Sequence, residues 1–181
     1  MVNLKKELES NKVLLLIVSG LEYNDRIVKV MKVLSGKSVA YVTLNKTNDS
    51  LKELFKKKKV DITNLVFVDA ISKTFKKAPE QAESVFYCSS PGSLTELSLI
   101  ITKFLKHDFD YIIFDSLTNL APYQKRDIII KFLSSLANKI KSSKTKAIFY
   151  ALDVKDGKEL IQQASVYMDN VINAEEINNS A

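Results

Sequence analysis

Several residue types are scarce in this chain of 181 residues, and each scarcity excludes a class of protein. Cys88 is the single cysteine, so no intrachain disulfide can form, and with His107 as the only histidine the chain has no cluster with zinc-ligand spacing. Arginine occurs only at Arg26 and Arg126, so lysine supplies nearly all of the positive charge behind the net charge of +6. This pattern is weak support for sequence-specific nucleic-acid recognition, which relies on arginine forks.

Long hydrophobic stretches are missing as well. No window approaches the roughly 18 apolar residues of a membrane-crossing helix, and residues 1–7 carry mixed charges where a signal peptide has an apolar stretch. We therefore expect a soluble, cytoplasmic protein without a membrane partner. With 46% hydrophobic residues the chain is long enough for one compact domain and short for two, so we expect a single domain over residues 1–181. Within it, residues 1–11 are expected to form a helix or arm, and residues 174–181 a frayed tail.

Short apolar runs rich in β-branched and aromatic residues predict β-strands. They cover residues 13–18, 38–43, 65–68, 85–88, 111–114, 147–150 and 171–172. Their nearly continuous hydrophobicity indicates strands that are covered on both faces, as in a parallel sheet. Between them, apolar residues at helical spacing predict amphipathic helices around residues 27–34, 94–105 and 129–140. This alternation predicts an α/β fold of three layers, with a doubly wound, mostly parallel sheet.

Polar residues between these segments predict where helices begin and end. Ser93 and Glu96 have the spacing of a capping box, which predicts a helix start at that point. Gly36 is expected to end the first long helix. Thr47 or Asn48 is expected to cap the next one. Residues 71–84 are the least regular stretch between predicted elements.

The chain has only four glycines, and this scarcity matters most after the first strand. A phosphate loop there would follow the pattern G-x-x-x-x-G-K-[ST], so that backbone N–H groups face the phosphates and the lysine neutralises their charge. Counted from Gly20, the last three positions of that pattern are Asp25, Arg26 and Ile27. The second glycine and the hydroxyl are absent, and Glu22 adds further negative charge. We expect normal triphosphate binding to be lost, with Arg26 as an electrostatic substitute for the lysine.

Two further strand ends carry candidate site residues. Asn45 and Lys46 follow the second strand, where hydrolysis would need a base or a water-orienting group, so general-base chemistry is expected to be lost there. The apolar run 111–114 leads into Asp115, followed by Ser116 and Thr118. A carboxylate and two hydroxyls at the end of a buried strand suit a magnesium ion. The alternative is that Asp115 and Thr118 satisfy backbone donors at the strand exit.

From about residue 13 to residue 172, the order and spacing of these segments resemble the KaiC-like and RecA-like branch of the P-loop ATPases, especially small archaeal KaiC-like members. The resemblance is carried by the first strand and its loop, by residues 41–44 and by residues 111–120, the counterpart of the Walker B strand. It implies a RecA-type sheet, ATP and magnesium in active members, and frequent self-association. This chain departs from the family at the phosphate loop and at a pair of glutamates, which are replaced by Asn45 and Lys46.

The leading hypothesis is a catalytically inactive RecA/KaiC-like homologue that acts as a protein-binding or regulatory scaffold. It would need no cofactor, and its partner would be another protein or further copies of itself. The alternative is a nucleotide-binding ATPase or sensor with an atypical phosphate loop. In that alternative the residues contacting ATP would be Gly20, Arg26, Asn45 and Lys46, and those holding magnesium would be Asp115, Ser116 and Thr118.

A third hypothesis rests on the lysine run of residues 56–59. These lysines end a predicted helix that begins near Ser50, where cations complement the helix dipole, so a solvated face is the simplest interpretation. Further lysines at positions 52, 73, 76 and 77 could extend the run into a face that binds a nucleic-acid backbone. Such binding would be independent of sequence and would weaken steeply with salt.

Overall fold

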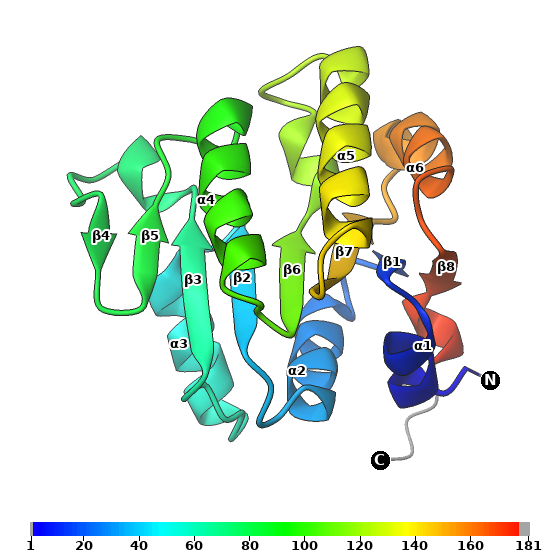
Figure 1. The fold of residues 1–181 in the computed structure, drawn as a ribbon, viewed down its shortest axis with the longest axis horizontal. Helices are drawn as coiled ribbons and strands as arrows, with labels where there is room; N and C mark the ends of the chain where they lie inside the picture. Colours follow the sequence, from blue (N-terminus) through cyan, green and yellow to red (C-terminus); the bar gives the residue numbers. More distant parts are fainter. Residues whose placement is uncertain (1, 178–181) are drawn as a thin grey trace.

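The computed structural model describes residues 2–177 and consists of three layers, a sheet with helices on both of its faces (Figure 1). The sheet has eight strands in the order β4-β5-β3-β2-β6-β7-β1-β8. Every neighbouring pair is parallel except β4 and β5. The strands are β1 (Val13–Val18), β2 (Val39–Thr43), β3 (Leu65–Asp69), β4 (Gln81–Ala82), β5 (Val85–Tyr87), β6 (Tyr111–Asp115), β7 (Lys146–Leu152) and β8 (Asn170–Asn173).

Helices connect the parallel strands. The α-helices are α1 (Leu4–Ser10), α2 (Tyr23–Val33), α3 (Asn48–Lys57), α4 (Leu94–Lys106), α5 (Arg126–Lys141) and α6 (Lys158–Ser165). Short 3-10 turns follow several strands: η1 (Ser72–Thr74), η2 (Leu117–Leu120), η3 (Lys155–Gly157) and η4 (Ala174–Glu176). The expected α/β architecture, a doubly wound and mostly parallel sheet between two helical layers, is confirmed.

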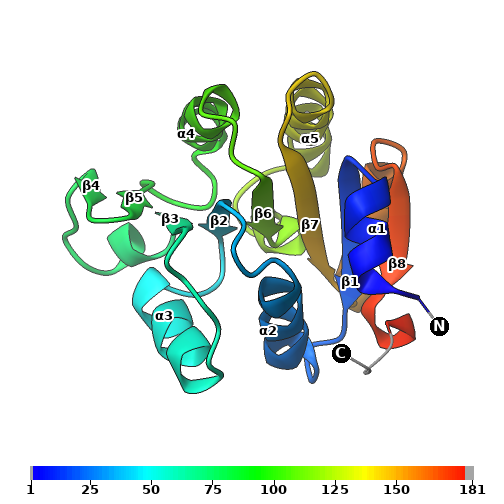
Figure 2. The ribbon, with the colours of Figure 1, turned by 60° about the horizontal axis from the view of Figure 1, so that its bottom comes forward.

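Two hydrophobic clusters lie on opposite faces of the sheet and explain why the strands are apolar throughout. Leu14 and Leu16 of β1 pack in one cluster with α1, α2 and α3, whereas Val13 and Leu15 pack in the other with α4, α5 and α6. Figure 2 shows α4 and α5 on one side of the sheet and α2 and α3 on the other. Because both faces are buried, alternate side chains of each strand enter different cores.

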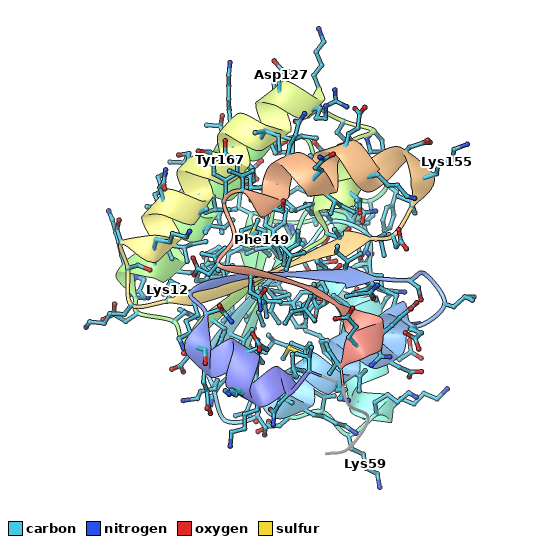
Figure 3. All side chains as sticks on the ribbon, turned by 90° about the vertical axis from the view of Figure 1, so that its right-hand side faces the viewer. Lys12, Lys59, Asp127, Phe149, Lys155 and Tyr167 are labelled. Carbon is cyan, nitrogen blue, oxygen red and sulfur yellow. The ribbon has the colours of Figure 1, made fainter. Side chains whose placement is uncertain are left out.

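Figure 3 shows the amino and carboxyl ends of the parallel strands at opposite sides of the molecule. Lys12 precedes β1 at the amino end, whereas Lys155 follows β7 at the carboxyl end; both point outward, while Phe149 lies between the sheet and the helices above it. The carboxyl ends of parallel strands meet at one edge, and ligands of open α/β sheets bind there, where the strand order reverses. The candidate site residues that follow β1, β2 and β6 therefore belong to this edge.

Several local expectations need correction. Strand β4 was not expected; it lies within the irregular stretch 71–84 and pairs antiparallel with β5 at the edge of the sheet. Helix α4 does begin after Ser93, but the expected capping box is wrong. Glu96 accepts a hydrogen bond from the Ser89 backbone N–H instead, and the Ser93 hydroxyl pairs with that of Ser90. The spacing of Ser93 and Glu96 predicts the start of the helix correctly, but the Glu96 carboxylate accepts its hydrogen bond from the preceding loop.

Other caps agree with the sequence. Thr47 is the N-cap of α3 and accepts a hydrogen bond from the Ser50 N–H at 3.1 Å. Gly36 follows α2 with a φ of +78°, a left-handed conformation that favours glycine. Cys88 is buried, and burial raises the pKa of its thiol to about 12.

The chain ends differ from the expected frayed tail. Residues 174–177 are packed, because Ile177 is buried and forms a parallel bridge with Val2. Residues 178–181 of that expectation lie outside the described residues. At the other end, α1 accounts for most of the expected N-terminal helix. No helix among the described residues combines the length and the apolar character that a membrane span requires.

Candidate functional site

The candidate site is centred on Asp115, the last residue of β6. This strand lies between β2 and β7, and Asp115 is in register with Thr43 at the end of β2. The chain reaches β2 from β1 through α2 on one face of the sheet, and it leaves β6 for β7 through α5 on the other face. Asp115 therefore lies at the carboxyl edge, between strands whose connections run over opposite faces, which is the usual place for a ligand.

Two tyrosine hydroxyls occupy one oxygen of the Asp115 carboxyl group. Tyr41 of β2 donates to Oδ2 at 2.5 Å, and Tyr23, the first residue of α2, donates to the same oxygen. The side chain of Asp115 is completely buried, and its other oxygen, Oδ1, is buried without a partner among the described residues. One side of the carboxyl group is thus filled by phenol groups from two distant parts of the chain.

Tyr23 also brings together the two candidate residues that follow β2. Its hydroxyl accepts a hydrogen bond from the Asn45 side-chain amide at 2.9 Å. The Lys46 ammonium group lies 5.7 Å from the centre of the Tyr23 ring, within the range of a cation–π contact. Of the residues singled out in the sequence, Asn45, Lys46 and Asp115 therefore do meet, but they meet around the side chain of Tyr23.

A third tyrosine, Tyr150 of β7, is also fully buried, and its hydroxyl has no partner among the described residues. The negative charge of Asp115 raises its pKa, after the larger effect of burial. We call Asp115 with Tyr23, Tyr41 and Tyr150 the strand-end tyrosine cluster. The three tyrosines were not expected from the sequence. A tyrosine within an apolar strand could have indicated a polar partner at this point, since a buried phenol usually needs a hydrogen-bond partner.

The buried environment of the cluster shifts the pKa values of its side chains. Burial raises the pKa of Asp115 to about 6, although the hydrogen bonds from Tyr23 and Tyr41 and the charge of Lys46 act in the opposite direction. Burial also raises the pKa values of Tyr23 and Tyr41, and the Asp115 charge raises them further. The phenols are therefore neutral hydrogen-bond donors, and the carboxyl group is the member of the cluster that titrates near neutral pH.

The turn that joins β1 to α2 is short. It comprises residues 19–22 and is closed by a hydrogen bond from the Glu22 N–H to the Ser19 carbonyl at 3.2 Å. Leu21, in the middle of the turn, is fully exposed. A Cβ added at Gly20 would meet no atom within 4 Å, so close packing does not require a glycine at that position.

Arg26, the expected substitute for a phosphate-loop lysine, is directed toward its own helix. Its guanidinium group forms an ion pair with Glu22 at 3.1 Å, one turn earlier on α2. A hollow of about 320 Å³ surrounds this pair and is also lined by Asp25 and Lys29. The lining of this hollow therefore consists of two carboxylates and two cations.

Ser116 and Thr118 tie the exit of β6 to neighbouring backbone. Their hydroxyls pair at 3.0 Å, and Thr118 Oγ1 accepts a hydrogen bond from the Leu152 N–H at the end of β7. Ser116 donates to the Asn119 side chain, and the Asp115–Ser116 peptide bond is cis. For Thr118 the simple structural role expected as the alternative is found, whereas Asp115 bonds to tyrosines in place of backbone donors.

A second strand end provides a contrast. Asp69, the last residue of β3, is as buried as Asp115, but its carboxylate accepts five hydrogen bonds. They come from the backbone and side-chain amides of Asn48, from the Ile71 N–H, and from the N–H and hydroxyl of Ser72, at 2.7–2.8 Å. Burial raises the pKa of Asp69, but these hydrogen bonds outweigh it and leave the pKa below the ordinary value.

The lysine run at the end of α3 is exposed, as expected. Carboxylates neutralise part of the wider group, because Lys58 pairs with Asp25 at 3.4 Å and Lys76 pairs with Asp49 at 3.2 Å. A nucleic-acid-binding role for this face stays a prediction. Within residues 2–177, no group of three or more His, Cys, Asp or Glu residues is arranged to hold a metal ion.

Comparisons with known proteins place the fold. No protein-family model matches the chain, and no curated protein matches its sequence. A KaiC-like protein from the hyperthermophilic archaeon Pyrococcus horikoshii matches in structure with a TM-score of 0.52 and 11% identity over 78% of this chain. The flagellar accessory protein FlaH from Methanocaldococcus jannaschii matches with a TM-score of 0.58 and 12% identity over 90% of this chain.

The matches cover 61% of the KaiC-like protein and 70% of FlaH, so the chain spans less than two thirds of the former. At 11–12% identity the likeness concerns the fold. It shows that this chain shares the α/β fold of these two proteins, as the resemblance of its sequence to the RecA/KaiC-like ATPases implied.

Proposed function

We propose that this chain is a catalytically inactive homologue of the RecA/KaiC-like ATPases and acts as a protein-binding or regulatory scaffold. The observation that carries the proposal is the pair of tyrosine hydroxyls, from Tyr23 and Tyr41, on the fully buried carboxyl group of Asp115. In the resemblance to that superfamily, Asp115 takes the position of the carboxylate that serves magnesium. Here the whole carboxyl group is buried, and two tyrosine hydroxyls donate to one of its oxygens.

Three features of the carboxyl edge support loss of nucleotide chemistry. A magnesium ion needs oxygen ligands that are open to water or phosphate, whereas the Asp115 carboxyl group is fully buried and one of its oxygens accepts hydrogen bonds from Tyr23 and Tyr41. The residues after β2 that could orient a water molecule are Asn45 and Lys46, and both contact Tyr23. The turn of residues 19–22 is short and has no second glycine to bring backbone N–H groups around a phosphate.

Retention of the fold supports a binding role. The hydrophobic layers on both faces of the sheet are intact, whereas the phosphate-loop pattern and the paired glutamates of the family are absent from the sequence. Large apolar side chains are exposed near the same edge of the sheet, including Leu21 after β1 and Val154 after β7. One structural neighbour, FlaH, is described as an accessory protein, which is compatible with a fold used for assembly.

Thermal unfolding with nucleotides tests the proposal. ATP or GTP at 1 mM with magnesium is expected to leave the Tm of the purified chain unchanged. A site with a Kd of about 1 μM would instead add roughly 4 kcal/mol to the free energy of unfolding, which is on the order of 10 °C in Tm for a chain of this size.

The control for this measurement is the Asp115→Ala variant. If Mg-ATP raises the Tm of the wild type, if the rise disappears in Asp115→Ala, and if ATP is turned over, the chain is an active nucleotide-binding protein and the proposal is wrong. Sedimentation of the nucleotide-free protein at several concentrations then measures whether the scaffold associates with itself.

A further inference from the structure

A groove lies between α4 and α5 on the face of the sheet opposite α2 and α3. Figure 1 shows these two helices in front of the sheet. The groove has a volume of about 490 Å³. Its lining comes from one helix on each side and consists of Thr102, Leu105, Lys106, Asn138, Lys139 and Ser142. We call this feature the α4–α5 groove.

The floor of the α4–α5 groove is apolar. Leu105 lies in it, and the hydroxyl of Thr102 donates to the Ser98 carbonyl at 2.7 Å, so that hydroxyl is already used within α4. The Ser142 hydroxyl likewise donates to the Asn138 carbonyl at 3.0 Å. Leu99, one helical turn before Thr102 and Lys103, is 64% exposed. An exposed leucine beside an apolar floor is a surface that another apolar side chain can cover.

The rim of the groove carries only positive charge. Residues 97–107 and 128–144 contain no aspartate or glutamate. The exposed lysines of this face are Lys103, Lys106, Lys131 and Lys139. Within residues 2–177, no carboxylate lies within 4.0 Å of these four ammonium groups, and Lys139 contacts only the Ser98 hydroxyl, at 3.3 Å.

The lysine face of α3 differs from this rim. There, Lys58 and Lys76 already have aspartate partners, and Glu53 is exposed among the lysines. Some lysines near the groove lie in the last turns of α4 and α5, where a cation complements the helix dipole. The helix dipole does not account for Leu99 or Lys131, which lie away from those ends.

We propose that the α4–α5 groove is a docking site for an acidic amphipathic helix of a partner protein. Apolar side chains of the partner helix would cover Leu105 and Leu99, and its carboxylates would pair with the lysines on both sides. This is the helix-in-groove mode of recognition, in which shape and apolar contact give affinity and charge sets the orientation. The inference deepens the proposed scaffold function, on which it rests, by naming the surface and the chemistry of the partner.

Charge and shape favour this occupant over two others. A nucleic acid would use the lysines but would leave Leu99 and the apolar floor uncovered, because a phosphate backbone offers no apolar side chain. A second copy of the same face would bring lysines against lysines, which is unfavourable. A helix with leucines on one side and glutamates on the other satisfies both parts of the groove.

A synthetic peptide tests the proposal. The probe is a fluorescein-labelled peptide of about 14 residues, long enough for roughly four helical turns, with leucines at i, i+3, i+4 and i+7 spacing and glutamates at most other positions. Fluorescence anisotropy at low ionic strength is expected to give saturable binding with a Kd of roughly tens of micromolar. Backbone amide shifts in NMR spectra are expected to move at Leu99, Thr102 and Asn138.

Matched variants locate the binding. The double change Lys106→Glu/Lys139→Glu is expected to weaken binding about tenfold or more, because it places carboxylates against carboxylates. Leu99→Asp tests the apolar part and is expected to weaken binding about fivefold or more. The control, Lys56→Glu/Lys57→Glu, makes the same change in charge on α3 and is expected to leave the Kd within about twofold. Circular dichroism checks that each variant is folded.

Several outcomes would overturn the proposal. They are absence of saturable binding, equal binding of a peptide with the same composition but scattered leucines, and loss of binding in the α3 control. Tighter binding of a 20-nucleotide single-stranded DNA, lost in Lys106→Glu/Lys139→Glu, would identify a nucleic-acid site instead. Self-association that is lost in Leu99→Asp would identify a second copy as the occupant.

Failure of this inference can be distinguished from failure of the proposed function. If the peptide does not bind but Mg-ATP still leaves the Tm unchanged, only the docking site is wrong. If Mg-ATP binds and is hydrolysed, the inactive-scaffold proposal is wrong whatever the peptide does.

Discussion

Strands β3 and β6 both end in an aspartate at the same edge of the sheet. The two carboxyl groups differ in the hydrogen bonds they accept and in the direction of their pKa shifts. Asp69 and Asp115 are both fully buried. Asp69 accepts five hydrogen bonds, and its pKa lies below the ordinary value. Asp115 accepts hydrogen bonds from tyrosines at one oxygen only, and burial raises its pKa to about 6. Burial alone therefore does not decide the charge of a strand-end carboxylate, because hydrogen bonds to the carboxylate oppose its effect on the pKa.

The donors to the two aspartates also come from different parts of the chain. The donors to Asp69 include the turn directly after it, through Ile71 and Ser72, and the first residue of α3, Asn48. Asp69 thus joins local elements. Asp115 has no such donors, and its partners are the side chains of Tyr23 and Tyr41, which lie far from it along the chain. We interpret Asp69 as part of the framework, whereas Asp115 is the centre of the strand-end tyrosine cluster.

The largest expected effect is the difference in unfolding free energy that is lost when each aspartate is replaced by alanine. Asp69→Ala leaves five donors without their acceptor and is expected to lower the free energy of unfolding by about 3–5 kcal/mol at pH 7. Asp115→Ala is expected to cost only about 1 kcal/mol, because it also removes the penalty of a poorly solvated charge. Urea unfolding followed by circular dichroism measures both values. Equal losses in the two variants would contradict the assigned difference.

The second prediction uses pH. The folded pKa of Asp115 is about 6, above the ordinary value of 3.8, so its stabilising contribution is present below pH 3.8 and is lost as pH rises through about 6. The Asp115→Asn variant does not titrate there. Its free energy of unfolding relative to wild type is therefore expected to rise by about 2 kcal/mol between pH 4 and pH 8.

Asp69 serves as the opposite case in the same experiment. Its folded pKa is lowered, so its contribution is present above pH 3.8 and is lost only as pH falls through the still lower folded pKa. Over most of the range from pH 4 to pH 8, Asp69→Asn is expected to differ from wild type by a nearly constant amount. A slope that appears for Asp69→Asn but not for Asp115→Asn would reverse the comparison.

The smallest expected effect concerns single hydroxyl groups. Tyr23→Phe removes one donor to Asp115 and is expected to cost about 1 kcal/mol of unfolding free energy. It should also raise the pKa of Asp115 further, because that hydrogen bond favours the ionised carboxylate. Carbon-13 NMR of the Asp115 carboxyl group measures the shift directly. An unchanged or lower pKa would show that Tyr23 does not stabilise the charge.

Tyr87→Phe provides the matched control beside Asp69. The Tyr87 hydroxyl accepts only a long 3.4 Å contact from Asn48 and does not touch the carboxylate. Its removal is expected to change the free energy of unfolding by roughly 0.5 kcal/mol or less. A larger loss than in Tyr23→Phe would place the more sensitive network at β3.

The strands could be predicted from the sequence because burial on both faces makes each one an apolar run. Residues 13–18 match β1 at both ends, and the central strands differ by at most a few residues. Strand β4 could not be predicted, because a two-residue edge strand with exposed side chains carries no apolar signal. The predicted capping box at Ser93 and Glu96 is wrong, because Glu96 instead accepts a hydrogen bond from the Ser89 N–H in the preceding loop.

The site was predictable in part. Asp115, Asn45 and Lys46 were chosen because polar residues that follow buried strands collect at the carboxyl edge, and all three do lie around one side chain there. Arg26 was chosen by its position in a motif, but the ion pair with Glu22 holds it on α2. The motif predicts where Arg26 lies along the chain. It does not predict the direction of its long side chain, which forms an ion pair with Glu22.

By itself, the sequence determined the layers of this protein, since apolar runs at strand and helix periods can be buried in few other ways. It also determined that no glycine-rich backbone follows β1. Only the tertiary structure decided what surrounds Asp115, because Tyr41 and Tyr23 lie 74 and 92 residues away along the chain. They reach the carboxyl group because β6 is inserted between β2 and β7, and strand order depends on the packing of the whole sheet.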